Sequence, residues 1–266
     1  MRTVVFVVMV AVLVATCALL SQHERRHDVA LVRPQLPVTT GAVLDLPVFS
    51  MTSTTPLNRA LRHNIILHKN LSKFSFRVLN ESAARRFVHK HCPASAPEYD
   101  NLVPIAFKAD LARLCMLFVF GGTWLDDDLM LQLPLNSYDT VPGELLLIED
   151  SLYTPPALDA PWRYGIWNAF MIVRRRRHPF IGCALQLATH RVRNQFRGRT
   201  TVSMTGPQMV SECIPANADV NIIGYIGGKN WLHASTWADE PIVRHVKVPR
   251  NKSVPHYQWG GRWFYH

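Results

Sequence analysis

The chain has 266 residues, of which 48% are hydrophobic and 18% charged, and its formal net charge is +10. So apolar a composition excludes intrinsic disorder, and 13 glycines and 18 prolines are too few for a collagen-like or low-complexity protein. The length suits one α/β domain, or two small ones at most. The positive charge favours anionic partners, namely nucleic acid, a membrane surface or phosphorylated substrates.

The N-terminus carries a continuous apolar segment, residues 3–20, with the sequence TVVFVVMVAVLVATCALL. As a helix it would span about 27 Å, close to the hydrocarbon thickness of a bilayer. We therefore predict a signal-anchor over residues 1–22 and a single-pass type II membrane protein whose lumenal domain lies in the Golgi or ER. Alternatives are a signal peptide cleaved near Cys17, giving a secreted protein, a buried helix, or a bacterial lipoprotein signal.

Residues 23–42 are polar, contain proline and lack periodicity, which is typical of a stem. No linker interrupts residues 43–266, so we predict one domain there. Its cysteines are Cys92, Cys115, Cys183 and Cys213. They either form two disulfides in an oxidising lumen or remain buried thiols, and their spacing does not indicate a zinc site.

Periodicity and capping residues predict alternating strands and helices along this domain. Strands are expected at residues 43–50, 74–79, 123–131, 144–148, 169–173, 220–225 and 242–248. Helices are expected at residues 81–91 (with Asn80 as N-cap), 103–120, 179–196 and 206–214. This alternation predicts an α/β fold with a mixed, mostly parallel sheet flanked by helices.

The chemistry-bearing residues fall between positions 108 and 128. Asp110 and Arg113 are three residues apart on the strongest predicted helix, so they share a face. After Gly121-Gly122 the sequence Thr-Trp124-Leu ends in Asp126-Asp127-Asp128. If this segment is a strand, Asp126 and Asp128 point to one side and Asp127 to the other.

Two carboxylates on one side of a strand end suit Mn²⁺ or Mg²⁺ with a substrate diphosphate. Each feature has an ordinary explanation when taken alone. An Asp-x-Asp pair is common in solvated turns, an Asp/Arg pair is often a surface ion pair, and Gly-Gly often ends a helix. The argument rests on their occurrence together, in this order, within about twenty residues.

The segment Asp-Leu-Ala-Arg-Leu from Asp110, then a long apolar helix and Gly-Gly-Thr-Trp-Leu-Asp-Asp-Asp, resembles the sugar-binding region of DXD-containing glycosyltransferases. These include glycosyltransferase family 32, with fungal Golgi α-mannosyltransferases, inositolphosphoceramide mannosyltransferases and α-1,4-galactosyltransferases. Trp124 stands where the family usually has tyrosine. Further matches are Asn168-Ala-Phe-Met, the His178-Pro179 turn and Thr205-Gly206-Pro207.

The resemblance implies a GT-A-like nucleotide-diphosphosugar-binding domain and a role for each matching residue. Asp110 and Arg113 would hold hydroxyls of the donor sugar, and Trp124 would line the donor pocket. Asp126 would contact the ribose or sugar and the metal, and Asp128 would bind the divalent cation. Asn168 would approach the sugar near the reacting carbon.

The C-terminus departs from the family, which often closes its site with a histidine and a Ser-Trp pair. Here the sequence is His256-Tyr-Gln-Trp259-Gly-Gly-Arg-Trp263, without the serine. His256 is a candidate metal or phosphate ligand, and Trp259 or Trp263 a candidate cover for the donor pocket. The alternative is that these aromatic residues only pack the end of the chain.

Four arginines at residues 174–177 have three possible explanations: a solvated turn, a membrane-facing or anionic-acceptor patch, or a nucleic-acid contact. The apolar N-terminus argues against nucleic acid. The motif and the resemblance together predict a metal-dependent hexosyltransferase, and the resemblance implies that it retains the anomeric configuration. Its donor would be GDP-mannose or a UDP-hexose and its acceptor a glycan or glycolipid. The alternative is a weakly active or inactive protein of the same fold that binds a nucleotide sugar or a partner.

Overall fold

We describe the fold from a computed structural model of the chain. The structure describes residues 46–53, 56–71, 74–150, 165–196, 198, 200–214, 220–226, 233–235 and 241–246. The predicted anchor and stem, and the predicted site residues His256 and Trp263, lie outside these ranges. No helix within them combines the length and apolar composition that crossing a bilayer needs.

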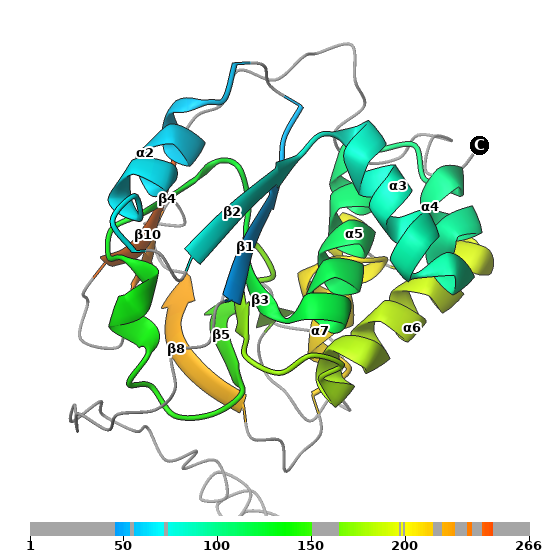
Figure 1. The fold of residues 1–266 in the computed structure, drawn as a ribbon. Helices are drawn as coiled ribbons and strands as arrows, with labels where there is room; N and C mark the ends of the chain where they lie inside the picture. The colour runs from blue at the N-terminus through cyan, green and yellow to red at the C-terminus, as the bar shows by residue number, and fades with distance from the viewer. Residues whose placement is uncertain are drawn as a thin grey trace, which may run out of the picture. The chain divides into compact units, whose positions relative to one another are not determined.

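The described residues form one mixed sheet with helices packed on it (Figure 1). The strands are β1 (Leu46–Met51), β2 (Phe74–Leu79), β3 (Gly122–Leu125), β4 (Leu129–Leu131), β5 (Leu145–Asp150), β6 (Gly165–Ile166), β7 (Phe170–Val173), β8 (Val220–Ile226), β9 (His233–Ser235) and β10 (Pro241–His245). The α-helices are α2 (Arg59–Leu67), α3 (Glu81–His91), α4 (Ala96–Asn101), α5 (Ile105–Phe120), α6 (Pro179–Arg193) and α7 (Pro207–Ser211). Short 3-10 helices are η1 (Pro93–Ser95), η2 (Leu135–Tyr138) and η3 (Thr201–Ser203).

The strand order is β2-β1-β3-β7-β5-β8-β9-β10-β4, and β6 pairs with β5. The pairings β1–β2, β1–β3 and β5–β8 are parallel, and two of these have the longest registers in the described sheet. The other pairings are antiparallel. The predicted α/β class, a mixed sheet flanked by helices, is confirmed.

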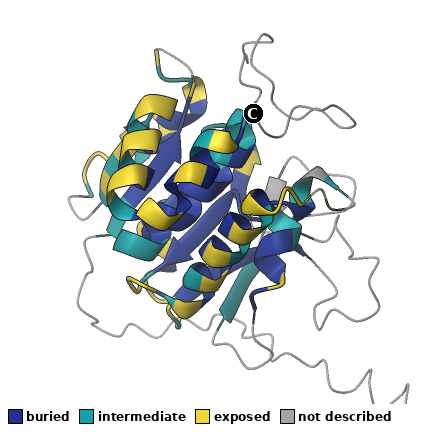
Figure 2. Ribbon diagram, turned by 90° about the vertical axis from the view of Figure 1, so that its right-hand side faces the viewer, coloured by how far each residue is buried: buried dark blue, intermediate teal, exposed yellow. Residues whose placement is uncertain are grey.

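Each face of the sheet supports its own hydrophobic cluster, because side chains alternate along a strand. On β5, Leu145 and Leu147 pack into the cluster formed with α3, α5 and α6. Leu146 and Ile148 pack into the cluster on the opposite face, beneath η2 and the end of α2. Figure 1 shows α2 on one side of the strands and α3, α5 and α6 on the other, and Figure 2 shows the buried strands behind helices with exposed outer faces.

The strongest predicted helices form close to their expected bounds. Asn80 caps α3 as predicted, since its Oδ1 accepts a hydrogen bond from the amide of Ala83 at 2.9 Å. Helix α5 begins at Ile105 rather than 103 and ends before Gly121, whose φ of 64° suits glycine. Pro179 lies in the first turn of α6, which ends at Arg193, three residues before the predicted end.

The predicted strand over residues 123–131 is wrong in its middle. Strand β3 stops at Leu125 and β4 starts at Leu129, so the three aspartates form a turn. The amide of Leu129 donates to the carbonyl of Asp126 at 3.1 Å, which closes that turn. An uninterrupted strand would place the carboxylates of Asp126 and Asp128 side by side on one face, whereas a turn lets each of the three take a different direction.

Helix α2 is not among the predicted elements. Asn58 caps it through a bond from the amide of Leu61 at 2.9 Å. Its buried Asn64 pairs with β4 as another strand would: Nδ2 donates to the carbonyl of Leu129 at 2.7 Å, and Oδ1 accepts from the amide of Leu131 at 2.9 Å. The helix therefore fixes the backbone that follows the aspartate turn.

Two disulfides join the helices on one face of the sheet. Cys92, after α3, bonds Cys115 of α5, and Cys183 of α6 bonds Cys213, after α7. Of the two states left open by the sequence, the structure has the disulfides. They enclose loops with sequence separations of 23 and 30 residues.

Candidate active site

Helix α5 brings Asp110 and Arg113 together on its buried face. Nη1 of Arg113 donates to Oδ1 of Asp110 at 2.8 Å, and the two residues retain only 3% and 4% of their accessible surface. A buried ion pair of this kind needs further hydrogen bonds to offset the loss of hydration. The surrounding residues supply them.

Asp110 accepts two further hydrogen bonds from residues distant in sequence. Nδ2 of Asn168, just before β7, donates to Oδ1 at 3.0 Å, and Oγ1 of Thr205 donates to Oδ2 at 2.9 Å. Burial raises the pKa of the Asp110 carboxyl, and the charge of Arg113 and the bonds from Thr205 and Asn168 oppose that rise. The carboxylate is thus held in one orientation by three side chains.

Arg113 connects this buried pair to the aspartate turn. Its Nη2 donates to Oδ1 of Asp126 at 2.7 Å, and Nε1 of Trp124 donates to the same oxygen at 2.6 Å. The guanidinium also lies 5.0 Å from the centroid of the Trp124 ring. Asp126 keeps 32% of its side chain exposed, so one carboxylate is both fixed from within and open to a ligand.

Asp127 and Asp128 take other directions from the same turn. Oδ2 of Asp127 accepts a hydrogen bond at 2.7 Å from Oγ1 of Thr52, which follows β1. The backbone carbonyl of Asp127 accepts one at 2.7 Å from Nδ2 of Asn58. The carbonyl of Asp128 accepts from the amide of Val246 at 2.7 Å. The expectation that Asp126 and Asp128 share one side and Asp127 the other assumed a strand, and the turn instead gives each carboxylate its own partners.

Asp128 lies beside a histidine that the sequence analysis does not single out. Nδ1 of His245, at the end of β10, is 3.9 Å from Oδ1 of Asp128, and its ring packs edge-on against Trp167 at 5.3 Å. The antiparallel pairing of β10 with β4 places it there, with His245 opposite Leu129. The predicted ligand His256 lies outside the described residues.

The donor set can be tested against a divalent cation. Ligands 2.1 Å from one Mg²⁺ are about 3 Å apart when adjacent and about 4.2 Å when opposite. The 3.9 Å between Asp128 and His245 lies between these two distances, so the two side chains would have to shift to bind one ion, and Asp126 offers a partly exposed carboxylate on the same turn. Within the described ranges no three acidic, histidine or cysteine side chains gather as a complete site. Such a set suits an ion whose remaining ligands are substrate phosphates and water.

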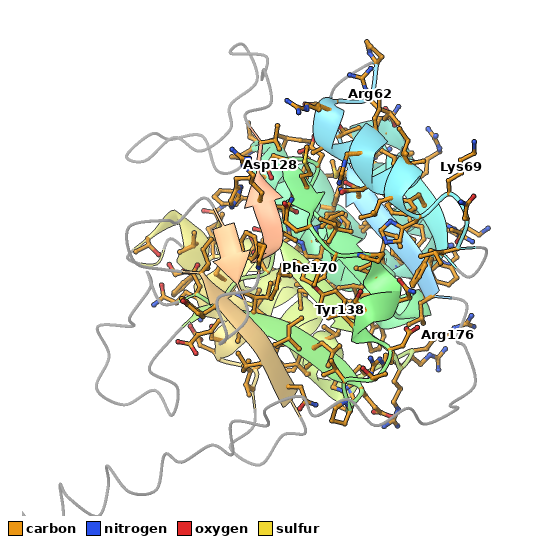
Figure 3. All side chains as sticks on the ribbon, turned by 90° about the vertical axis from the view of Figure 1, so that its left-hand side faces the viewer. Arg62, Lys69, Asp128, Tyr138, Phe170 and Arg176 are labelled. Atoms are coloured by element: carbon orange, nitrogen blue, oxygen red, sulfur yellow. A yellow bond between two sulfur atoms is a disulfide. The ribbon has the colours of Figure 1, made fainter. Side chains whose placement is uncertain are left out.

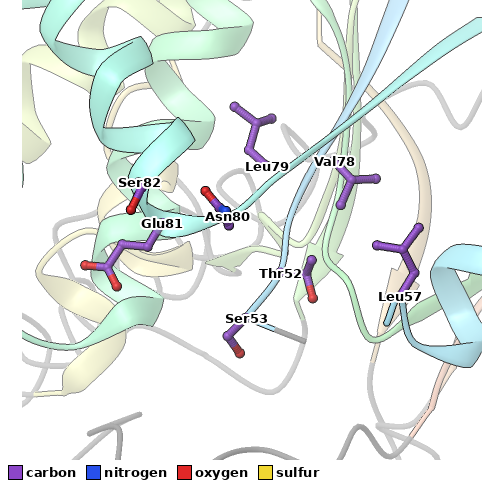
Figure 4. Close-up of a pocket in the computed structure, with 8 residues that line it drawn as sticks. All are labelled: Thr52, Ser53, Leu57, Val78, Leu79, Asn80, Glu81 and Ser82. Carbon is purple, nitrogen blue, oxygen red and sulfur yellow. The ribbon is translucent and has the colours of Figure 1, made fainter. Parts of the chain in front are cut away.

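A pocket of about 560 Å³ opens at the carboxyl ends of β1 and β2 (Figure 4). It is lined by Thr52, Ser53, Leu57, Val78, Leu79, Asn80, Glu81 and Ser82. Thr52 belongs both to the pocket and, through its bond to Asp127, to the aspartate turn. The pocket therefore adjoins the candidate active site at the sheet edge where open α/β folds bind ligands.

The predicted site residues Asp110, Arg113, Trp124, Asp126 and Asn168 thus form one hydrogen-bonded network, and Asp128 lies on the same turn. Thr205 joins them, although the sequence had pointed to it only through the resemblance of its Thr-Gly-Pro motif. His245 has no local sequence signal, because only strand pairing brings it to Asp128.

The comparisons with known proteins bear on this region. The family model described as glycosyltransferase sugar-binding region containing DXD motif matches residues 56–144, about a third of the chain. That match includes α5 and the whole aspartate turn. No curated protein is similar enough in sequence to count as a match.

Two solved structures align with parts of this chain at low similarity. One, described as the PaToxG glycosyltransferase, is 15% identical, with a TM-score of 0.48 over 64% of this chain and 68% of that one. The other, A197 from STIV, is 12% identical, with a TM-score of 0.30 over 78% of this chain and 98% of that one. The sequence match over residues 56–144 agrees with the resemblance of the central motif, while the narrower assignment to family 32 stays a prediction.

Proposed function

We propose that this protein is a glycosyltransferase that transfers a hexose from a nucleotide-diphosphate sugar to a glycan or glycolipid hydroxyl. The observation that carries the proposal is the link from Asp110 through Arg113 to Asp126, within the segment that matches the DXD sugar-binding region. It joins a buried polar pair suited to sugar hydroxyls to an exposed carboxylate suited to a metal-bound diphosphate.

Asp110 and Arg113 orient the donor sugar. A carboxylate has about four acceptor positions, and the described residues occupy three of those on Asp110. One position is left for a sugar hydroxyl, next to a guanidinium that cannot move without breaking its bonds. Holding the sugar in one orientation lowers the entropic part of the barrier to transfer.

Asp126, Asp128 and His245 would hold the divalent cation, Mn²⁺ or Mg²⁺. Bound there, the ion would neutralise charge on the departing nucleotide diphosphate. Carboxylate ligands favour these hard ions over softer transition metals. His256 remains a candidate for the same group, since the sequence predicts it and it lies outside the described residues.

The pocket beside Thr52 is our candidate for the nucleoside. Its volume of about 560 Å³ lies in the range of small-molecule sites, and its lining mixes apolar side chains with hydroxyl and amide groups. Since Thr52 also bonds Asp127, a nucleoside in the pocket would have its phosphates directed toward the turn. Trp124 holds Asp126 in place through the hydrogen bond that its Nε1 donates to Oδ1.

We further propose that transfer retains the α configuration by same-face displacement. The resemblance implies this outcome, and Asn168, the predicted residue near the reacting carbon, is an amide and no covalent nucleophile. An NMR spectrum of the first product gives the anomeric configuration directly. An inverted product would contradict this part of the proposal alone.

The test is a screen of GDP- and UDP-sugars with Mn²⁺ or Mg²⁺, read as free nucleotide released. Asp128→Asn should lower release by about a hundredfold or more, and chelation should lower it equally, because both remove charge stabilisation of the leaving group. Asp139→Asn, an exposed aspartate on the surface beyond η2, is the matched control and should stay near wild type. Full activity in Asp128→Asn would refute the proposal.

A second function follows from the altered C-terminal motif at residues 256–263. If calorimetry shows nucleotide-sugar binding while no donor or acceptor gives turnover, the protein is a binding protein of the same architecture. Its membrane attachment through residues 1–22 stays a proposal from the apolar sequence.

A further inference from the structure

The arginine run at residues 174–177 lies beside the point where the described fold begins. Gly122 of β3 pairs with Val173 of β7, immediately before the run. A Cβ on Gly122 would lie 2.2 Å from the carbonyl oxygen of Pro47, and one on Gly121 would lie 3.6 Å from that of Arg175. The first residues of β1 therefore lie next to these arginines.

The turn that carries the run is held by its own backbone and by its first arginine. The guanidinium of Arg174 donates to the carbonyl of Gly143 at 2.9 Å and to those of Tyr138 and Val141. The amide of Arg177 donates to the carbonyl of Phe118 at 2.6 Å, with Arg177 in the left-handed region at φ 54°. This conformation is uncommon for a long side chain, and here the packed turn imposes it. Arg174 is thus structural, and the next three arginines are exposed.

Phe120 lies close to two arginines at the same place. The guanidinium carbons of Arg77 and Arg176 lie 5.8 and 6.0 Å from the centroid of the Phe120 ring, with the His91 ring at 5.6 Å. The electron-rich ring attracts both guanidinium groups. Arg175 has a carboxylate partner, Glu144, at 3.3 Å. Within the described ranges, no ion pair involves Arg77, Arg176 or Arg177.

We propose that these four residues, Arg77, Arg175, Arg176 and Arg177, form a docking surface for an anionic phospholipid membrane. We name it the arginine edge. Two observations favour a membrane over another polyanion. The apolar segment at residues 3–20 is long enough to enter a bilayer, and β1, the first described strand after it, begins at this edge. Basic residues next to such a segment bind anionic headgroups as a second attachment signal.

The placement also leaves the candidate active site accessible. Strand β7 starts beside Asn168 at the site and ends at the arginine run, so the two lie at opposite ends of the same strand. Figure 3 shows the labelled side chains of Asp128 and Arg176 well apart on the fold. With the arginine edge on the headgroups, the aspartate turn is held away from the bilayer, at the other end of β7, and stays open to an acceptor.

The test uses the full chain with two kinds of vesicle, pure phosphatidylcholine and phosphatidylcholine with about 30% phosphatidylserine. Flotation measures binding to each kind of vesicle. If the apolar segment binds the chain to both kinds, hydrogen exchange at residues 174–182 measures whether the arginine run contacts the surface. The triple variant Arg175→Gln, Arg176→Gln, Arg177→Gln removes the edge and keeps Arg174. Its matched control removes three exposed charges from α2 and the residues after it, as Arg59→Gln, Arg62→Gln, Lys69→Gln.

We expect wild type to gain binding or amide protection on the anionic vesicles, and this gain to fall with salt. At roughly fivefold in affinity for each arginine near the surface, the triple variant should lose about a hundredfold of the gain. The control should keep it. Equal behaviour on both vesicles, an equal loss in the control, or displacement by RNA at lower concentration than lipid would each overturn the proposal. Unchanged thermal unfolding of the variant excludes misfolding as the cause.

Discussion

Arg113 and Asp126 are 13 residues apart, and the guanidinium of one holds the carboxylate of the other at 2.7 Å. The same guanidinium bonds Asp110 at 2.8 Å, so the position of the turn depends on a helix that is itself fixed in the core. A site assembled in this way should be sensitive to the geometry of the arginine and not only to its charge.

Replacing Arg113 with lysine keeps the charge but removes the planar fork that reaches both carboxylates. Misplacing the turn by about 1 Å should lower nucleotide release by roughly a hundredfold. The measurement is kcat and KM for the best donor, with Arg85→Lys, in an exposed ion pair, as control. Activity within about threefold of wild type would show that the fork is dispensable.

Thr205 is 95 residues from Asp110 and bonds its buried Oδ2. Thr205→Val keeps the shape and leaves that oxygen without this donor, so the free energy of unfolding should fall by about 1–3 kcal/mol. Thr205→Ser restores the hydroxyl and should recover most of the loss. Urea unfolding of the three proteins measures this, and a valine variant as stable as wild type would contradict it.

His68 should make stability depend on pH. Nδ1 lies 2.6 Å from the carbonyl of Asn64, and Nε2 accepts from the amide of Leu135 at 2.8 Å, an arrangement that only the neutral ring can make. Burial lowers the pKa of His68 below its usual 6.5; the bond to the carbonyl of Asn64 opposes this, and nearby His63 lowers the pKa further. The contribution of His68 to stability is therefore present above pH 6.5 and lost as the pH falls through the folded-state pKa.

The measurement is the free energy of unfolding at pH values from about 7.5 to about 5, on both sides of the ordinary histidine pKa of about 6.5. His68→Gln removes the titrating group, so the variant should lose part of the acid-induced destabilisation. An identical pH profile in the two proteins would assign that destabilisation to other groups.

Asn64 should be sensitive to an isosteric change. Asn64→Asp keeps the acceptor for the amide of Leu131 but replaces the donor to the carbonyl of Leu129 with a second oxygen. A buried charge facing a carbonyl should cost about 3–5 kcal/mol. Thermal unfolding measures it, and Asn70→Asp, at an exposed position after α2, is the control. A small effect would mean that α2 does not hold β4.

The elements that were predicted correctly carry signals within a few residues of one another. Helix α3 has an asparagine cap, α5 has apolar residues at helical spacing and a glycine at its end, and the spacing of Asp110 and Arg113 puts them on one face. These features depend on neighbours within a few residues. The central motif was therefore identified together with the helix that carries it.

The features that were predicted wrongly or not at all depend on contacts between residues far apart in the sequence. The turn at the aspartates needs Thr52 and Asn58 to receive Asp127, from segments 75 and 69 residues away. His245 reaches Asp128 only through the pairing of β10 with β4. Helix α2 mixes polar and apolar residues, and its buried Asn64 makes sense only against β4, whose backbone it bonds. No local pattern contains this information.

Among the described residues the sheet ends at β4, and the outer side of this strand bonds the side chain of Asn64 instead of another strand. Asn64 satisfies the carbonyl of Leu129 and the amide of Leu131, and His63 lies 3.1 Å from the carbonyl of Leu131. An edge strand with unpaired backbone groups invites pairing with another chain. Because α2 occupies those groups, a second copy cannot extend the sheet here, and the segment that carries the aspartates is protected from aggregation.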